Sequence, residues 1–95
     1  MTEREREIAL ERTAKIRRVV LLVVQEGAAY GSSLRMIERG LAEFGLQVSI
    51  EDVEGAVRYA DGKGWVQLKP LANTPAMRRW VITAAGVDQI EVGDR

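Results

Sequence analysis

The 95-residue sequence contains neither cysteine nor histidine. This absence excludes disulfide bonds, thiolate nucleophiles and imidazole bases, and it removes the side chains from which zinc sites are usually built. Glu51, Asp52 and Glu54 could in principle bind Mg²⁺ or Ca²⁺, but neighbouring residues on a helix point in different directions. The composition therefore predicts a protein without a metal or cofactor, and not an enzyme.

Long apolar runs are also missing. No run approaches the ~20 residues that cross a membrane, and the first ten residues, MTEREREIAL, alternate in charge where a secretory signal would carry an apolar segment. We therefore expect a cytoplasmic protein. A chain of 95 residues with 46% hydrophobic side chains is expected to form one domain around one core.

A net charge is lacking too, because 14 basic side chains balance 14 acidic ones. The distribution is nevertheless uneven. Residues 66–83 carry three basic and no acidic side chains, whereas residues 49–63 carry four acidic and two basic ones. The basic residues of the first segment are Lys69, Arg78 and Arg79.

Residues 1–14 are predicted to form a charged helical extension. Thr2 and Glu5 have the spacing of a capping box, and Glu and Arg recur three or four positions apart. One interpretation is a lead-in that only aids solubility; the other is an arm that pairs with a second copy of the chain. The apolar residues expected at such a homodimer interface are Ile8, Leu10 and Ile16.

Three core helices are predicted next. The apolar run Val19–Val24 could form a buried strand, but it continues the charged helix without a turn residue, so a helix ending at Gly27 is favoured. A second, amphipathic helix begins after Ser32 or Ser33. Gly40 inside it costs ~1 kcal/mol relative to alanine, which indicates that another backbone passes close by. The third helix begins at Ser49, and its apolar stripe is Val53, Ala56, Val57 and Ala60.

The remaining elements are a short strand, a hairpin and a terminal helix. LQVS, residues 46–49, predicts a very short strand. WVQLK and RRWVIT predict a hairpin whose strands are joined by residues 70–77. Trp65 and Trp80 lie at the root of this hairpin and are expected to pack in the core or an interface. Thr83 caps a short terminal helix that ends near residue 92, before a polar tail over residues 93–95.

The order of these elements resembles the winged helix-turn-helix superfamily over residues 15–92. YADGKGWVQLK is similar to that superfamily's end of the recognition helix, glycine turn and first wing strand, and WVITAAG to its second wing strand and helix start. Residues 25–68, QEGAAYGSSLRMIERGLAEFGLQVSIEDVEGAVRYADGKGWVQL, more narrowly resemble the small winged-helix regulators of Mu-like transposable phages and prophages. The resemblance implies a mainly α fold with a small β-hairpin (α+β): a three-helix core, a wing and a short C-terminal helix.

That resemblance implies a phage-type transcriptional regulator that binds double-stranded DNA through the third helix and the basic wing. The acidic start of the third helix departs from this pattern, because carboxylates repel phosphates. The alternative is therefore a winged-helix module that has lost DNA binding and contacts a protein partner. Tyr30 is expected to pack rather than to bind phosphate. The residues expected at DNA are Ser49, Arg58, Lys69, Asn73, Thr74, Arg78 and Arg79.

Overall fold

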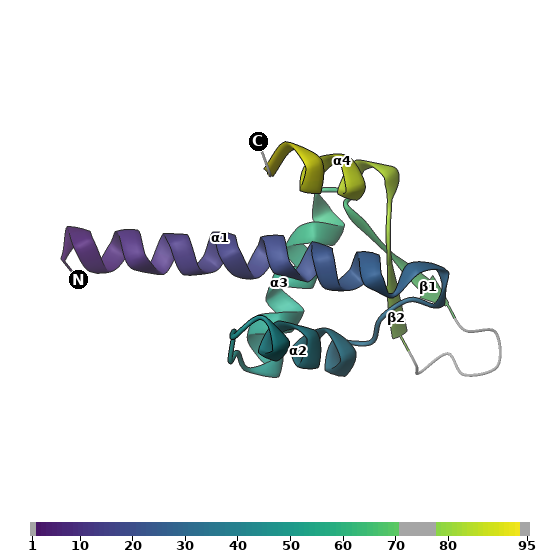
Figure 1. Ribbon diagram of the computed structural model, residues 1–95, viewed down its shortest axis with the longest axis horizontal. Helices are drawn as coiled ribbons and strands as arrows, with labels where there is room; N and C mark the ends of the chain where they lie inside the picture. Colours follow the sequence, from purple (N-terminus) through teal and green to yellow (C-terminus); the bar gives the residue numbers. More distant parts are fainter. Residues whose placement is uncertain (1, 71–77, 94–95) are drawn as a thin grey trace.

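The computed structural model describes residues 2–70 and 78–93. Within them the fold is mainly α with one two-stranded antiparallel hairpin, as predicted (Figure 1). The elements in chain order are α1 (Glu3–Glu26), η1 (Ala28–Tyr30, a 3₁₀ turn), α2 (Leu34–Glu43), α3 (Ile50–Gly62), β1 (Val66–Pro70), β2 (Arg78–Ile82) and α4 (Ala84–Gly93).

Helix α1 is a single uninterrupted helix of 24 residues. The Thr2 hydroxyl accepts a hydrogen bond from the Glu5 amide at 3.2 Å, and Gly27 ends the helix, so both predicted boundaries are confirmed. Residues 2–15 are exposed and extend away from the rest of the molecule (Figure 1), whereas Val19 and the residues that follow it are largely buried. We call the exposed helical segment, residues 3–15, the arm.

The inner half of α1 is the centre of the core, with α2, α3 and α4 packed around it. Gly40 of α2 faces this half. A Cβ added to Gly40 would lie 2.6 Å from Cγ1 of Val23. The close approach at Gly40 is therefore made by a side chain of α1, whereas the sequence had suggested another backbone. The fully buried large side chains of the core are Val20, Val24, Ile37, Leu41, Val53, Val57 and Val66.

Serine hydroxyls cap both helices of the helix-turn-helix. Ser33 accepts from the Met36 amide and Ser49 from the Asp52 amide, each at 3.2 Å. Ser32, the other candidate cap of α2, instead forms a one-residue bridge to β2. Its amide donates to the Trp80 carbonyl and its carbonyl accepts from the Trp80 amide, both at 2.8 Å.

The prediction of a short strand at residues 46–49 is wrong, because these residues form no strand and the sheet consists of β1 and β2. Its apolar pattern reflects core packing instead: Leu46 is buried and Val48 packs against the core. The backbone beside the hairpin comes from the turn before α2. Gly31 has a φ of 79° there, a conformation that suits glycine, and it places Ser32 next to Trp80.

The hairpin is packed at its root. Leu68 pairs with Trp80 and Val66 with Ile82, and because cross-strand partners share a face of the sheet, these four residues lie on the same side. Trp80 and Trp65 are half-buried against the core, which confirms their packing role. The Thr83 hydroxyl accepts from the Gly86 amide at 3.1 Å, so α4 is capped as predicted.

Candidate nucleic-acid interface

Helix α3 turns its apolar stripe inward and leaves a polar outer face. Val53, Ala56, Val57 and Ala60 are buried, as the periodicity predicted. The exposed positions of the helix include Glu51, Gly55, Arg58 and Asp61. This outer face is the surface that a recognition helix presents to the major groove, and it carries more negative than positive charge.

Arg58, the residue of α3 expected at DNA whose long basic side chain could reach a base edge, already has a partner on its own helix. Its Nη2 donates to Oε1 of Glu54 at 2.6 Å, one turn away. Both side chains are substantially exposed, at 76% and 44%, and exposed pairs of this kind contribute ~0 to 1 kcal/mol. The pair is therefore cheap to open when a stronger acceptor is present.

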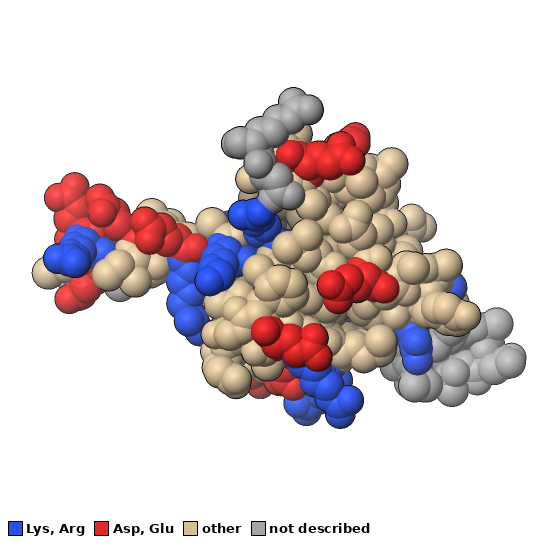
Figure 2. Space-filling model, in the orientation of Figure 1, with Lys and Arg blue, Asp and Glu red and all other residues tan. Residues whose placement is uncertain are grey.

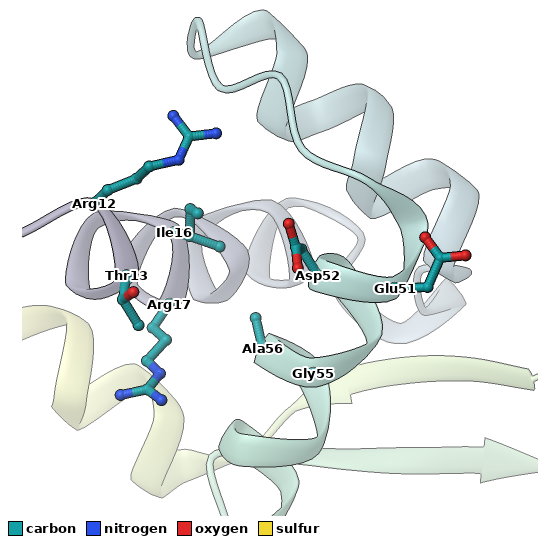
Figure 3. A pocket seen from close by; sticks show the side chains of 8 residues that line it. All are labelled: Arg12, Thr13, Ile16, Arg17, Glu51, Asp52, Gly55 and Ala56. Carbon is teal, nitrogen blue, oxygen red and sulfur yellow. The ribbon is translucent and has the colours of Figure 1, made fainter. Parts of the chain in front are cut away.

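One of the three carboxylates at the start of α3 is turned toward α1. Asp52 lines a pocket between the two helices together with Arg12, Ile16 and Arg17 of α1, and Glu51 lies at the far side of the same pocket (Figure 3). Arg12 crosses toward the segment before α3, where its Nη2 donates to the Gln47 carbonyl at 3.0 Å. The charge of Asp52 therefore faces the basic part of α1, so that of the three carboxylates at the start of α3 only Glu51 and Glu54 remain on its outer side.

The three wing cations do not form a single cluster. Successive residues of a strand point to opposite faces, so Arg78 and Arg79 diverge. Lys69 pairs with Arg79 across the hairpin and shares its face, while Arg78 lies on the face of Trp80. The closeness of these residues in the sequence predicted one basic patch. The pleat of the strands instead places Lys69 and Arg79 on one face of the hairpin and Arg78 on the other.

The face of Lys69 and Arg79 adjoins η1. The Lys69 ammonium donates to the Ala29 carbonyl, and a Cβ added to Gly31 would lie 2.9 Å from Cβ of Arg79. Nε of Arg79 is buried and has no hydrogen-bond partner among the described residues. Tyr30 at the end of η1 is 82% exposed, so the expectation that it packs is wrong.

The face of Arg78 meets the outer face of α3. A groove of about 320 Å³ runs between them, and its lining includes Arg58, Arg78 and Trp80 together with the carboxylates of Glu54 and Asp61. Of the residues predicted from sequence, the structure thus brings together Arg58 and Arg78. The groove holds two cations and two anions, so a ligand there would meet no strong field of one sign.

The other predicted contacts fall in different places. Ser49 is the N-cap of α3, with its hydroxyl engaged by the Asp52 amide. Asn73 and Thr74 lie outside the described residues. Arg35, which sequence reasoning did not single out, is 72% exposed in the first turn of α2 and pairs with Glu38 at 3.3 Å. The sequence feature that could have identified Arg35 is its position two residues after the Ser33 cap, in the first turn of α2.

The surface view agrees with this distribution. Figure 2 shows acidic and basic groups mixed along the arm, basic groups where the arm meets the body, and separate acidic groups over the body. No face of one sign dominates this view.

No group of three residues that could hold a metal ion is found within residues 2–70 and 78–93. Over the same part of the chain, no helix is both long and apolar enough to span a bilayer.

These elements define a winged-helix fold: a helix-turn-helix of α2 and α3, followed by the hairpin and supported by α1 and α4. Two solved structures with this arrangement are single-residue mutants of MepR from S. aureus, in which lysine or arginine replaces one glycine of that protein. The lysine mutant superposes with a TM-score of 0.68 at 16% identity, covering 97% of this chain and 73% of its own. The arginine mutant gives 0.62 at 17% identity, covering 96% and 71%. No family model and no curated protein sequence matches the chain.

Proposed function

We propose that this protein is a DNA-binding transcription regulator in which the wing makes more of the phosphate contacts than α3 does. The observation that supports this most is the exposed outer face of α3 beside a hairpin segment with three cations and no acid. MepR, which shares the fold, is a winged-helix regulator of the MarR family. A binding role of this kind involves no catalysis.

Arg58 is the residue of α3 that we expect to read a base. To do so it must leave Glu54, which costs at most about 1 kcal/mol for an exposed pair. A bidentate arginine contact to guanine discriminates against other bases by ~1 to 3 kcal/mol. Replacing the Arg58–Glu54 pair by an Arg58–guanine contact is therefore favourable at a matching site. At other sites the free energy of binding changes little, and this difference is what sequence recognition needs.

The test is fluorescence anisotropy with labelled duplex DNA at several salt concentrations. Replacing Arg78 and Arg79 with alanine should weaken binding to all sequences about equally and reduce the salt slope by roughly 1 to 2 units, as for lost phosphate contacts. The matched control is the double replacement of Arg4 and Arg6 on the arm, which removes the same charge far from α3. Equal effects of the two variants would contradict a specific role of the wing.

The alternative is a protein-interaction module, and the acidic outer face of α3 favours it. Replacing Glu51 and Glu54 with glutamine discriminates between the two functions. For a DNA-binding protein the change removes two repelling carboxylates and tightens non-specific binding. If neither the wild type nor this variant binds duplex DNA at low salt, the regulator proposal fails and the interaction module replaces it.

Three finer features belong to the same proposal. The Mu-like phage or prophage origin is supported by the resemblance of residues 25–68 alone. A cytoplasmic location follows from the proposed contact with DNA. A homodimer is supported by the arm, on which Ile8 and Leu10 are 57% and 64% exposed, whereas Ile16 already packs partly against this chain's own core.

A further inference from the structure

A mainly apolar pocket of about 290 Å³ lies where α1, the end of α3, the hairpin root and α4 meet. Its aliphatic wall is formed by Ala14, Leu21 and Ile90. Leu21 and Ile90 are buried, whereas Ala14 is exposed, so the apolar interior can be reached from solvent. The volume is at the lower limit of the ~300 to 1,000 Å³ that is usual for ligand sites, which favours a small molecule.

Positive charge distinguishes this pocket from the two described above. Arg17 and Arg18 line it, and no acidic residue is found among its described lining residues. The pocket between α1 and the start of α3 holds two arginines and two carboxylates, and so does the groove between α3 and the hairpin. Of these three hollows, the one at the hairpin root therefore has the lining that attracts an anion.

Arg17 presents its hydrogen-bond donors at this pocket. Its guanidinium carbon lies 3.7 Å from the centre of the Tyr59 ring, and its side chain turns away from Asp52 (Figure 3). Stacking on a ring uses the face of a guanidinium and leaves the N–H groups in its plane able to donate. Arg17 forms no hydrogen bond or ion pair with another described residue. Its donors can therefore bind a carboxylate without displacing an existing partner.

The aromatic side chains of the pocket are partly engaged with their own neighbours. Arg17 covers one face of the Tyr59 ring. The Tyr59 and Trp65 rings meet edge to face with their centroids 5.8 Å apart, and in such a contact the edge of one ring covers the face of the other. The interior surface that remains comes mainly from Leu21 and Ile90, and such a surface suits a flexible alkyl chain better than a flat ring.

We propose that this pocket binds a medium-chain aliphatic carboxylate, with the alkyl chain against Leu21 and Ile90 and the carboxylate paired with Arg17. The volume sets the chain length. A methylene occupies about as much space as a water molecule, ~30 Å³, so the pocket holds on the order of ten non-hydrogen atoms. Octanoate, with about eight carbons and a carboxylate, is of this size. Ligand binding at this pocket does not require that the protein binds DNA, so it extends beyond the proposed function.

Octanoate is the probe, and the two tryptophans report where it binds. Trp65 lines the pocket, whereas Trp80 lines the groove between α3 and the hairpin. In proton–nitrogen correlation spectra of the full chain, octanoate should shift the indole signal of Trp65 and leave that of Trp80 in place. The dissociation constant should be on the order of 0.1 to 1 mM, as for a ligand of this size. No saturation by about 10 mM, or a larger shift at Trp80, overturns the inference.

A ligand series separates the contribution of the chain from that of the head group. From hexanoate to octanoate, each added methylene should tighten binding by about fourfold, the equivalent of ~0.8 kcal/mol. Octanamide, which is neutral and of the same length, should bind roughly 10- to 100-fold more weakly, because the charged contact to Arg17 is lost. Equal binding of octanamide and octanoate, or tighter binding of the aromatic naphthoate, overturns the inference.

Variants of α1 test the charge. Arg17→Gln should weaken octanoate binding by roughly 10- to 100-fold and leave octanamide binding nearly unchanged. Arg12→Gln is the matched control, because it removes the same charge from α1 outside this pocket, and it should have little effect on either ligand. Equal weakening by the two variants would show general attraction to the basic part of α1 and overturns the inference.

A second pair of variants tests the hollow itself. Ala14→Leu should fill part of the pocket and weaken octanoate binding by more than about tenfold, because the added side chain competes with the ligand for space. The variant should fold, since residue 14 is exposed. Ala9→Leu makes the same change at another exposed position of α1 and should leave binding unchanged. Octanoate binding that survives Ala14→Leu overturns the inference.

Discussion

The two halves of helix α1 form the same secondary structure for different physical reasons. The arm, residues 3–15, is exposed, and its stabilisation within the chain comes from the Thr2 cap, favourably spaced charges and, near its inner end, the hydrogen bond from Arg12 to the Gln47 carbonyl. The inner half is held by burial, with Val20 and Val24 fully enclosed. Isolated helices shorter than ~12 to 15 residues are marginal in water, so the arm depends on the inner half that continues it. Three substitution pairs can test this comparison.

The largest contrast is expected between two leucines on the same face of α1. Leu21→Ala removes a side chain that is 2% exposed, and it should lower the free energy of unfolding by ~2 to 5 kcal/mol. Leu10→Ala, the same chemical change on the arm, should alter the stability of the monomer by less than ~0.5 kcal/mol. Urea denaturation at low protein concentration, where a dimer is dissociated, measures both. A large loss for Leu10→Ala would place the arm in this chain's own core.

An intermediate effect is expected from comparing Gly40, which faces the inner half of α1, with Gly55, which has open space beside it. Gly40→Ala forces a Cβ against Val23, and this overpacking should cost ~1 to 3 kcal/mol despite the better helix propensity of alanine. Gly55→Ala on α3 meets nothing within 4 Å and should stabilise the protein by ~0.5 to 1 kcal/mol. Thermal unfolding would show melting temperatures moving in opposite directions. If both rise, α2 can shift away from Val23 and the packing there is looser than the contact indicates.

The smallest effect is expected at the helix caps. Ser49→Ala removes the cap of α3, a helix packed into the core, and should cost ~1 kcal/mol of global stability. Thr2→Ala removes the equivalent cap of the arm. There the loss should appear as faster amide exchange in the first turns of α1, with no change in the denaturation midpoint, because the arm can fray without opening the core. Equal shifts of the midpoint would show that the arm unfolds together with the core.

The sequence was sufficient for the features that depend on local pattern. The stripe of α3 and the caps at Thr2, Ser49 and Thr83 follow from spacing, and all of them are present. The Val19–Val24 run was ambiguous between strand and helix on its own. Its continuity with the charged segment before it settled the choice, because nothing between them could end a helix.

The features that were not predicted correctly depend mostly on contacts between distant segments of the chain. Residues 46–49 have the apolar pattern of a short strand, but Leu46 is apolar because it enters the core. The pairing of Ser32 with Trp80 joins segments far apart in the chain, and no local pattern marks it. The wing cations were counted as a group from their proximity in sequence, although the alternation of Arg78 and Arg79 could have been foreseen. The pairing of Arg58 with Glu54 was likewise available from their i, i+4 spacing.

The bridge between Ser32 and Trp80 bears on how the molecule meets a ligand. Its two backbone hydrogen bonds, together with the contact of Lys69 with Ala29, attach both strands of the hairpin to the turn that leads into α2. These contacts fix the position of the start of α2 relative to the hairpin. A ligand that touches α3 and the hairpin root together meets groups whose relative positions are already set, so little conformational entropy is lost there on binding.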